Sequence, residues 1–558
     1  MSVMLFLLMV LWGCADLSVQ STDTHTGHTA ETQTYTSTTL TIPKDTAETG
    51  KTASPSLDIV TASPPPGLFV ERVEVVLSTQ KDATIYYALE NSEQVSFKPY
   101  VAPITLTEST LLHTYASKEN TISEIVTTAY VLVNNEVASF TSNIPVMFIS
   151  GHQNISNDPD ISRVPTAMVL VEPETPNPLT ARAGIKVRGS SSSGHPKKPY
   201  ALETWNSLED TDKNVALLDF PADSDWVLYA PIVYDRALIR NSLMYALSNS
   251  IGRYAPRTRF IELFVVDDSD AVSMGHYVGV YALIEKIKRG EDRVDVAKLD
   301  ESDTTEPDIS GGYLFKEDRT GPSESGFTAG TAGGQFSFQQ SFVNIDPNED
   351  DLSVEQSEWL ISYLNTFGFL LANQSEYDTH IDVDSFIDHH ILNLFSKNPD
   401  GFRLSGYFHK DREGLLNAGP IWDFDRTMGC ASDSRSENPT WWDASNETSD
   451  TTYYFTHGWF KGLFNDPDFQ TRYFERLSSL LDNELSSKSV NAMIDAMQSE
   501  ISEAAERNFE QWSDYPPRGG SLETEVALLK TWLTQRNNWM KNCINSTALD
   551  SPVDCNGY

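Results

Sequence analysis

Two carboxylates flank one aromatic residue in the stretch GPIWDFDRTMGC, residues 419–430. Asp423 and Asp425 follow an apolar Pro-Ile-Trp run, so we expect them in an extended, nearly buried strand, where residues two apart face the same side. Charged oxygens in such a place need a positive partner. A Mg²⁺ or Mn²⁺ ion, the guanidinium group of Arg426, and solvent at a strand edge are the three alternatives, and the residues alone leave them open.

A Ser/Gly-rich loop in VRGSSSSGHPKKPY is a second candidate for chemistry. Arg188 precedes the loop, and Lys197 and Lys198 follow it. Small residues let backbone N–H groups approach a phosphate closely, and the basic side chains add charge. The spacing is not that of a Walker loop, and an ordinary surface hairpin is the alternative.

Three further charged residues complete the candidate set. Glu285 in GVYALIEKI and Lys316 in GGYLFKE could pair and hold a lysine at phosphates, as a kinase Lys–Glu ion pair does. Charges at strand ends are the alternative. Asp400 in SKNPDGF lies directly after a predicted helix, where a carboxylate can accept a proton from a hydroxyl group. A plain Asn-Pro-Asp-Gly turn is the alternative there.

The elements that must position these residues mix strands and helices. AGIKVRGSSSSGHPKKPYALET predicts two strands joined by a loop, and RFIELFVV, HYVGVYALIEKI and GGYLFKE predict three more. Helices are predicted over DRALIRNSLMYALSNSIG, stopping at Gly252, and over DVDSFIDHHILNLFSKN, with Asp384 as the N-cap. Helices dominate after Leu477. The pattern predicts an α+β, two-lobed catalytic domain.

The preceding segment, residues 63–134, has short alternating apolar runs separated by polar turns every eight to twelve residues or so. This spacing predicts a small all-β sandwich of about seven strands. The segment resembles the Ig-like module at the C-terminus of chitobiases and hexosaminidases, in its Ile-Tyr-Tyr-Ala, its later Pro-Ile-x-Leu and its closing Tyr130. Such a module is usually a spacer or accessory domain, so we assign it no chemistry.

The first 14 residues form a short apolar run that ends in Leu11-Trp12-Gly13-Cys14. The run is too short to span a bilayer but has the length of a signal-peptide core. Leu-x-Gly-Cys resembles a bacterial lipobox, which implies lipidation of Cys14. No Lys or Arg precedes the run, and a cleaved secretory peptide or a meaningless apolar tail are the alternatives. Residues 15–62 are Ser/Thr-rich and predict a flexible stalk.

We therefore expect an exported protein with an extracytoplasmic location, either a bacterial membrane-anchored lipoprotein or a secreted protein. In an oxidising compartment Cys543 and Cys555, close together near the C-terminus, are the natural disulfide pair. Cys430 is then left as a buried structural thiol, because no His or Cys stands at metal-ligand spacing from it.

The charge balance limits the partners. The chain has 79 acidic and 40 basic residues, a formal net charge of −39. Both nucleic acid and anionic lipid need a basic surface, so we expect no nucleic-acid partner. We expect contact with a membrane only through the N-terminal lipid anchor.

Taken together, the motifs resemble the CotH kinase family, the spore coat protein H-like proteins, over residues 140–545, which leaves 546–558 as a C-terminal tail. The resemblance rests on six pieces in the family's order: VRGSSS…KKPYAL, DRALIRNSLMYALS, GHYVGVYALIEKI, GGYLFKE, NPDGF…YF and IWDFDRTMG. It implies a divergent, two-lobed protein-kinase-like fold. It also implies ATP-dependent phosphorylation of secreted or surface proteins on Ser or Thr, chiefly Ser, with Mg²⁺ or Mn²⁺.

The resemblance assigns roles to single residues. It implies that Asp400 is the catalytic aspartate in its Asn-x-Asp context, and that Asp423 binds the metal with Asp425 as its helper. Arg188 and either Lys198 or Lys316 would contact the ATP phosphates, and Glu285 would orient a lysine. The ordinary kinase signatures H-R-D and D-F-G are absent as such.

Two other functions compete with the kinase. The first is a catalytically inactive surface adhesion or structural lipoprotein that keeps the same fold. The second is a carbohydrate-active hydrolase, which the chitobiase-like module suggests. A hydrolase needs two separated carboxylates around the glycosidic bond, and Asp423 and Asp425 are too close together in the sequence to serve.

Overall fold

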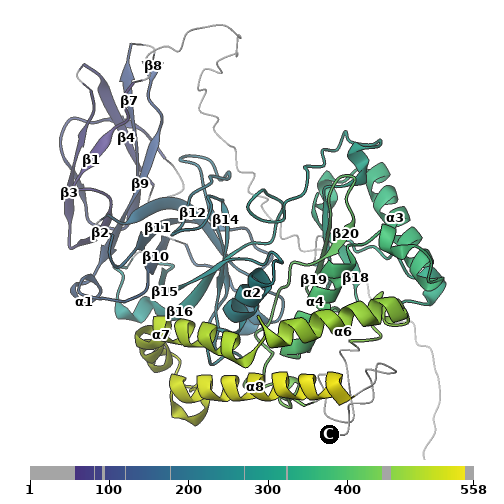
Figure 1. Ribbon diagram of the computed structural model, residues 1–558. Coiled ribbons are helices and arrows are strands. Elements are labelled where there is room, and N and C mark those ends of the chain that lie inside the picture. Colours follow the sequence, from purple (N-terminus) through teal and green to yellow (C-terminus); the bar gives the residue numbers. More distant parts are fainter. Residues whose placement is uncertain are drawn as a thin grey trace, which may run out of the picture. The chain divides into compact units, whose positions relative to one another are not determined.

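The computed structural model describes residues 57–546, apart from gaps at 81, 91–94, 120, 152, 176, 269, 322–323, 441 and 443–453. The predicted leader with Cys14, the stalk as far as residue 56, the tail after residue 546 and Cys555 lie outside the described residues. The described part has a mixed α/β fold (Figure 1). None of its helices is both long enough and apolar enough to cross a membrane.

The N-terminal part of the described chain is all-β and fits an Ig-like module. One sheet has the order β1 (Thr61–Ser63), β3 (Val73–Ser78), β6 (Ile104–Leu106). The other has the order β2 (Gly67–Val70), β9 (Val126–Val133), β7 (Thr110–Lys118), β4 (Thr84–Glu90), β5 (Lys98–Pro99), with β8 (Thr121–Ile122) paired to β7. Val60 is buried in the core between these sheets. The module therefore begins before residue 63, and the predicted end of the stalk at residue 62 is too late.

A closed seven-stranded barrel follows, after the short helix α1 (Asn135–Ala138). Its order is β10 (Val146–Gly151), β11 (Val164–Val171), β12 (Leu179–Val187), β13 (Tyr200–Thr204), β14 (Asp225–Tyr229), β16 (Tyr277–Glu285), β15 (Thr258–Val266). Neighbouring strands are antiparallel except β10 and β15, which close the barrel in parallel. The two strands predicted on either side of the Ser/Gly loop are β12 and β13, and they pair as a hairpin.

The module and the barrel share one hydrophobic core. Leu111, Ala129 and Val131 of the module pack in the same buried cluster as Phe148 and Phe264 of the barrel. A polar contact lies beside this core, where the Arg182 guanidinium group on β12 donates to the Glu90 carboxylate on β4 at 2.9 Å. Burial of apolar surface is the main stabilising term in folding, so the two regions stabilise each other.

The rest of the chain builds a second sheet with helices around it. The sheet has the order β18 (Ser341–Asp346), β17 (Tyr313–Asp318), β19 (Gly406–Lys410), β20 (Leu416–Ala418). The helices are α3 (Val354–Ala372), α4 (Val383–Ser396), α5 (Phe460–Leu463), α6 (Pro467–Asp482), α7 (Ser487–Gln511) and α8 (Leu522–Ser546). α7 packs against β16, so the helical part contacts the barrel directly.

Helix α2 (Arg240–Ser250) lies where the barrel meets the second sheet and its helices, in contact with β15, α4 and α7 (Figure 1). It begins later than its apolar pattern predicts, because Leu238 has a left-handed backbone with φ 65°. Gly252, at φ 87°, follows its end as predicted, in a conformation that glycine adopts without steric cost.

The start of α4 corrects one prediction. Its N-cap is Asp382, not Asp384, because the Asp382 side chain accepts a hydrogen bond from the Ser385 N–H at 3.1 Å. Asp384 lies in the first turn and forms an ion pair with Arg472 at 2.8 Å. An acidic side chain is favourable at either position, and the geometry of the preceding chain decides which one caps.

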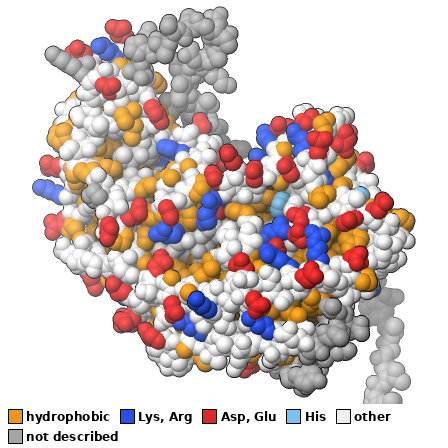
Figure 2. Space-filling view, viewed as in Figure 1, with side chains coloured by type: hydrophobic (Ala, Val, Ile, Leu, Met, Phe, Trp, Pro, Cys, Tyr) orange, Lys and Arg blue, Asp and Glu red, His pale blue; other side chains and the backbone are white. Residues whose placement is uncertain are grey.

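The molecular surface reflects the composition. Figure 2 shows acidic and basic side chains interspersed over the face in view. The acidic excess of the sequence is thus accompanied by many local pairings, such as Lys288 with Asp225 at 2.8 Å.

Candidate active site

The segment that carries Asp423 and Asp425 is a loop, not the strand that the sequence predicts. It follows β20, and Pro420 has no N–H group with which to continue a ladder. Asp423 itself has a left-handed backbone, with φ 67°. That conformation costs a non-glycine residue of order 1 kcal/mol, and such strain gathers at functional sites.

Helix α2 holds this loop through its backbone. The N–H of Phe424 donates to the Asn241 Oδ1 at 2.6 Å, and the N–H of Asp423 donates to the Tyr245 Oη at 3.3 Å. The side chain of Phe424, the residue between the two acids in the sequence, is completely buried in the hydrophobic core. The aromatic residue therefore anchors the loop, while the acids on either side of it stay near the surface.

A buried arginine at the start of α2 also holds the loop in place. The Arg240 guanidinium group pairs with Asp235 at 2.8 Å, and its Nε donates to the Thr427 carbonyl at 3.0 Å. Both side chains are fully buried. Breaking a buried pair leaves an uncompensated charge, so this pair fixes the loop firmly against α2.

Neither Asp423 nor Asp425 has a side-chain hydrogen bond or an ion pair with any residue that the structure describes. Arg426, the rival partner considered above, is instead paired with Asp433 at 2.8 Å and with Asp400 at 3.2 Å. The salt-bridge alternative for the two acids is therefore wrong. A cation or solvent remains as the partner of these carboxylates.

Crowding and mutual repulsion raise the pKa of both acids. The pKa of Asp423 rises to about 6, through burial first and then through the negative charges of Asp400 and Asp318. Burial, followed by the charges of Asp423 and Asp235, raises the pKa of Asp425 well above its usual value. The Asp423 side chain nevertheless stays open to solvent. Charged neighbours therefore act on a carboxylate that solvent can still reach.

Asp423 and Asp425 are together the number of carboxylate ligands that Mg²⁺ commonly takes from a protein. Within the described ranges, no group of three or more His, Cys, Asp or Glu side chains is gathered closely enough to enclose a metal. Mg²⁺ commonly takes one or two carboxylates and fills its remaining positions with water and phosphate oxygens. A pair of unpartnered hard oxygens with raised pKa values matches that pattern.

Asp400 lies beside this pair, on the loop that follows α4. It is 8% exposed, and three guanidinium groups surround it: Arg403 at 2.5 Å, Arg426 at 3.2 Å and Arg435 at 3.6 Å. Its charge contributes to the raised pKa values of Asp423 and Asp425, so the three acids share one electrostatic environment.

Asn398 connects the two acidic loops. Its Oδ1 accepts a hydrogen bond from the Asp400 N–H at 3.1 Å, and its Nδ2 donates to the Asp423 carbonyl at 3.2 Å. Its own carbonyl accepts from the Tyr454 hydroxyl at 2.7 Å. The Asn-x-Asp spacing brought this residue into view in the sequence, but nothing there indicated that it would join Asp400 to Asp423.

The three predicted basic residues each have a partner within the protein. Arg188 has its guanidinium carbon 5.6 Å from the centre of the Trp422 ring, and its charge acts on Asp423. Lys198 donates to the Ser193 carbonyl at 2.7 Å and so holds the Ser/Gly loop. Lys316 forms an ion pair with Asp318 at 2.9 Å. The contacts of these three with a phosphate remain predictions.

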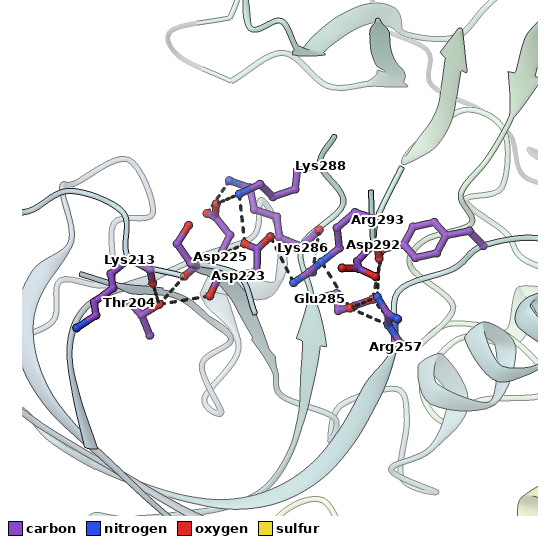
Figure 3. A network of polar contacts seen from close by, with 12 residues as sticks. Thr204, Lys213, Asp223, Asp225, Arg257, Glu285, Lys286, Lys288, Asp292 and Arg293 are labelled. Carbon is purple, nitrogen blue, oxygen red and sulfur yellow. Dashed lines mark hydrogen bonds and ion pairs between the residues drawn. The ribbon is translucent and has the colours of Figure 1, made fainter. Parts of the chain in front are cut away.

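Glu285 does not pair with Lys316, so that prediction is wrong. At the end of β16, Glu285 is buried and accepts from the Arg257 Nε at 2.8 Å, with the Arg293 Nε at 3.5 Å (Figure 3). The nearby Lys288 is bonded to Asp225 in the same network. Glu285 therefore anchors the segment that leaves the barrel. Glu285 lies at the end of β16 and Lys316 lies inside β17, and sequence spacing alone could not show which partners each would find.

The sequence did not indicate that two further residues would lie close to the acidic pair. Asp235 is buried and contributes to the raised pKa of Asp425. Tyr229, the last residue of β14, has a pKa raised well above its usual value by burial and by the charges of Asp425, Asp235 and Asp423. They lie in turns and strand ends whose neighbours are decided by the tertiary fold, and a single sequence does not reveal such neighbours.

The cysteines agree with the expected oxidation states as far as they are described. Cys543 is disulfide-bonded, while its predicted partner Cys555 lies outside the described residues. Cys430 is a free, buried thiol, and burial raises its pKa to about 11. A thiol in that state is inert at neutral pH.

Comparison with known families gives two matches. A family model described as CotH kinase protein matches residues 185–540, and one described as chitobiase/beta-hexosaminidase C-terminal domain matches residues 64–128. A search of curated proteins found no match. The longer match spans the barrel from the end of β12, the second sheet and the helices, and includes Asp400, Asp423 and Asp425.

Proposed function

This chain belongs to the CotH kinase protein family, and from that premise we propose that it is an atypical protein kinase. It transfers the γ-phosphate of ATP, with Mg²⁺ or Mn²⁺, to Ser or Thr residues of extracytoplasmic proteins. The barrel with α2 corresponds to one lobe of a divergent kinase-like fold, and the β17–β20 sheet with its helices to the other. The Asp423 backbone bonds to Tyr245 of α2, and Asp400 lies on the loop after α4.

The observation that carries the proposal is the pair of carboxylates without a partner. Asp423 and Asp425 repel each other, hold raised pKa values and lie on a strained loop that α2 fixes in place. A divalent ion would relieve the repulsion, and it would neutralise phosphate charge in phosphoryl transfer. Arg188, Lys198 and Lys316 are the candidates for direct contact with the phosphates.

Asp400 is the proposed acceptor of the hydroxyl proton. The Ser or Thr oxygen forms a new bond to the γ-phosphorus, the bond from that phosphorus to the bridging oxygen breaks, and ADP leaves. The proton of the hydroxyl group passes to Asp400, which aligns the acceptor. Asn398 supports this geometry because it joins the Asp400 backbone to the Asp423 backbone.

The proposed location is extracytoplasmic, either membrane-anchored through a lipid on Cys14 or secreted. It rests on the leader-like N-terminus and on the cysteine usage. The proposed partners are secreted or surface proteins that carry Ser or Thr.

Two measurements on the full chain test the proposal. In a thermal-shift assay, ATP together with Mn²⁺ should raise the Tm more than either alone, because a ligand that prefers the native state stabilises it. Radiolabelled γ-phosphate should then be transferred to a protein acceptor by the wild type but not by Asp423→Asn. If the nucleotide–metal pair neither stabilises the protein nor supports transfer, the alternative of an inactive surface adhesion or structural lipoprotein replaces the kinase.

A further inference from the structure

A cavity of about 240 Å³ lies where the end of α2, helix α4 and strand β20 meet the segment that leaves β16. Residues 419–421, which lead into the acidic loop, form part of its lining. Asp400, Asp423 and Asp425 do not line it. The cavity is therefore separate from the acidic site, although the same segment of chain borders both.

Among the residues that line the cavity, no buried charge lacks a partner of opposite sign. Arg253 donates to Asp388 at 2.8 Å, and Arg293 lies 3.5 Å from the Glu285 carboxylate. Asp295, the third charged residue of the lining, is exposed to solvent. A charged ligand would lose its hydration here without gaining a free counter-charge, which is costly. The cavity therefore suits an uncharged ligand.

Two neutral imidazole rings supply polar groups to the cavity. Burial lowers the pKa of His389 to about 4 and also lowers the pKa of His409. The His409 Nδ1 donates to the Gly419 carbonyl at 3.0 Å, so its Nε2 carries a lone pair and can accept. The His389 ring makes no hydrogen bond with any residue that the structure describes, although this residue is only 4% exposed. Because a neutral imidazole keeps one N–H, His389 offers a donor.

Apolar side chains form much of the remaining wall. Val294, Leu392 and Ile421 are buried and line the cavity. A cavity of about 150 Å³ is large enough to hold benzene. The larger volume here therefore has room for two fused rings, and the apolar wall favours a ligand with an apolar body over water alone.

We propose that this cavity is a second binding site, for a small uncharged ring compound that carries one N–H donor and one acceptor. The donor bonds to the Nε2 of His409, and the acceptor takes the N–H of His389. The rings of the ligand pack against Val294, Leu392 and Ile421. The inference does not rest on the proposed kinase function, because it uses none of the acidic residues.

The experiment measures binding of three probes to the full-length protein by ligand-observed NMR titration at pH 8. Benzimidazole is uncharged at this pH and has one N–H and one acceptor nitrogen on two fused rings. Indole keeps the N–H and lacks the acceptor, whereas 1-methylbenzimidazole keeps the acceptor and lacks the N–H. We expect each of these two controls to bind about threefold to tenfold more weakly than benzimidazole, the scale of one hydrogen bond between neutral groups.

His409→Asn tests whether the probe binds in the cavity. The asparagine amide can keep the hydrogen bond to the Gly419 carbonyl, but the acceptor at the Nε2 position is lost. The variant should bind benzimidazole severalfold more weakly and should no longer prefer it to 1-methylbenzimidazole. His276→Asn is the matched control, since His276 is also half-buried but lies just before β16 and accepts from the Ser273 N–H. It should bind all three probes as the wild type does.

A wild-type crystal soaked with benzimidazole gives a second measurement that does not depend on how any variant folds. Density for the probe between His389 and His409 would support the inference. Equal affinity for the three probes, or density for benzimidazole only at another place on the protein, would overturn it. Displacement of benzimidazole by ATP with Mn²⁺ would assign the cavity to the nucleotide and overturn the claim of a second site.

Discussion

At the scale of single residues, Asp423 and Asp425 are the costliest side chains of the site. A carboxyl group whose pKa is raised in the folded state destabilises the fold increasingly as the pH rises from the unfolded-state pKa to the folded-state pKa, and the cost stays constant above that. The pKa of Asp423 is about 6, against a usual value of 3.8, so at pH 7 both the folded and the unfolded chain carry the charge and the repulsion acts fully. A metal site tolerates this cost because the ion removes it.

Asp423→Asn should therefore stabilise the metal-free protein. The pKa shift sets an upper limit on the gain, and because the side chain is open to solvent, screening reduces the expected gain to about 1 kcal/mol at pH 7. The gain should vanish at pH 3, where the wild-type carboxyl group is already neutral. Urea unfolding at both pH values measures it. A destabilised variant at pH 7 would show that Asp423 has a stabilising partner that this account lacks.

Asn398→Ala tests whether the link between the acidic loops matters for transfer. The substitution removes the hydrogen bonds to the Asp423 carbonyl and from the Asp400 N–H. Phosphate transfer should fall by about tenfold or more, because small displacements of reacting groups are costly, while stabilisation by ATP and Mn²⁺ should persist. Asn373→Ala is the control, since the Asn373 side chain donates a hydrogen bond to the Phe369 carbonyl at the end of α3. Equal transfer rates for Asn398→Ala and wild type would refute the positioning role.

At the scale of elements, helix α4 carries a histidine that must stay neutral. The His390 Nε2 donates to the Tyr454 carbonyl at 3.0 Å, so its Nδ1 accepts from the Tyr473 hydroxyl at 2.9 Å. Burial lowers the pKa of His390 to about 3. The Tyr454 hydroxyl in turn donates to the Asn398 carbonyl. Hydrogen bonds through Tyr454 therefore connect His390 on α4 with the loop that carries Asn398 and Asp400.

Acid should therefore unfold the protein partly through His390. Below pH 6.5 the unfolded chain binds a proton at this ring and the folded chain does not, so the free energy of unfolding falls as the pH drops from 6.5 towards 3. The loss from this ring alone should be about 2 kcal/mol at pH 5. Urea unfolding at pH 7 and pH 5 should show a smaller difference for His390→Gln than for wild type. An unchanged difference would mean that His390 is already protonated in the fold.

The sequence predicted individual elements better than their connections. Alternating apolar residues correctly indicated β12, β13, β15, β16 and β17, because period and composition are local properties. The parallel pairing of β10 with β15 that closes the barrel joins residues more than a hundred positions apart, and no local pattern reports it. The wrong partner was predicted for Glu285 for the same reason, since no local pattern reports contacts between distant residues.

In the candidate site too, local motifs were predicted correctly and the backbone conformation and long-range neighbours were not. Its acidic residues stood out by their motifs, and Asp400 and Asp423 do share one environment. The loop conformation around them did not follow from the pattern, because Pro420 and the positive φ of Asp423 override the strand that the apolar run suggests. The approach of Arg403, Arg426 and Arg435 to Asp400 was not predicted, because these residues come from separate turns.

At the scale of the whole molecule, the Ig-like module has a core of its own and also shares a buried apolar cluster with the barrel, so we do not expect it to be a detachable spacer. Its strand β9 contacts β11 and β12, and Ala129 and Val131 are completely buried beside Phe264. The contact between Glu90 and Arg182 adds a charged anchor, and the pKa of Glu90 falls to about 2 because the hydrogen bonds from His113 and Arg182 outweigh the effect of burial.

A chain that starts at residue 140 should therefore fold poorly. Removing the module exposes the barrel residues Phe148, Val169 and Phe264, which now share its core. We expect insoluble protein or a Tm lower by at least 10 °C, from several kcal/mol of lost burial. The control is a chain that starts at residue 57 and keeps the module. Equal Tm values for the two chains would show that the module is an independent spacer.

The most direct test of the central claim is a crystal of the full chain with Mn²⁺ and a non-hydrolysable ATP analogue. We expect an anomalous peak for manganese bound by carboxylate oxygens of Asp423 and Asp425 and by phosphate oxygens of the nucleotide, and no such peak in crystals of Asp423→Asn. A nucleotide seated without metal, or carboxylates that contact only water or arginine, would contradict it.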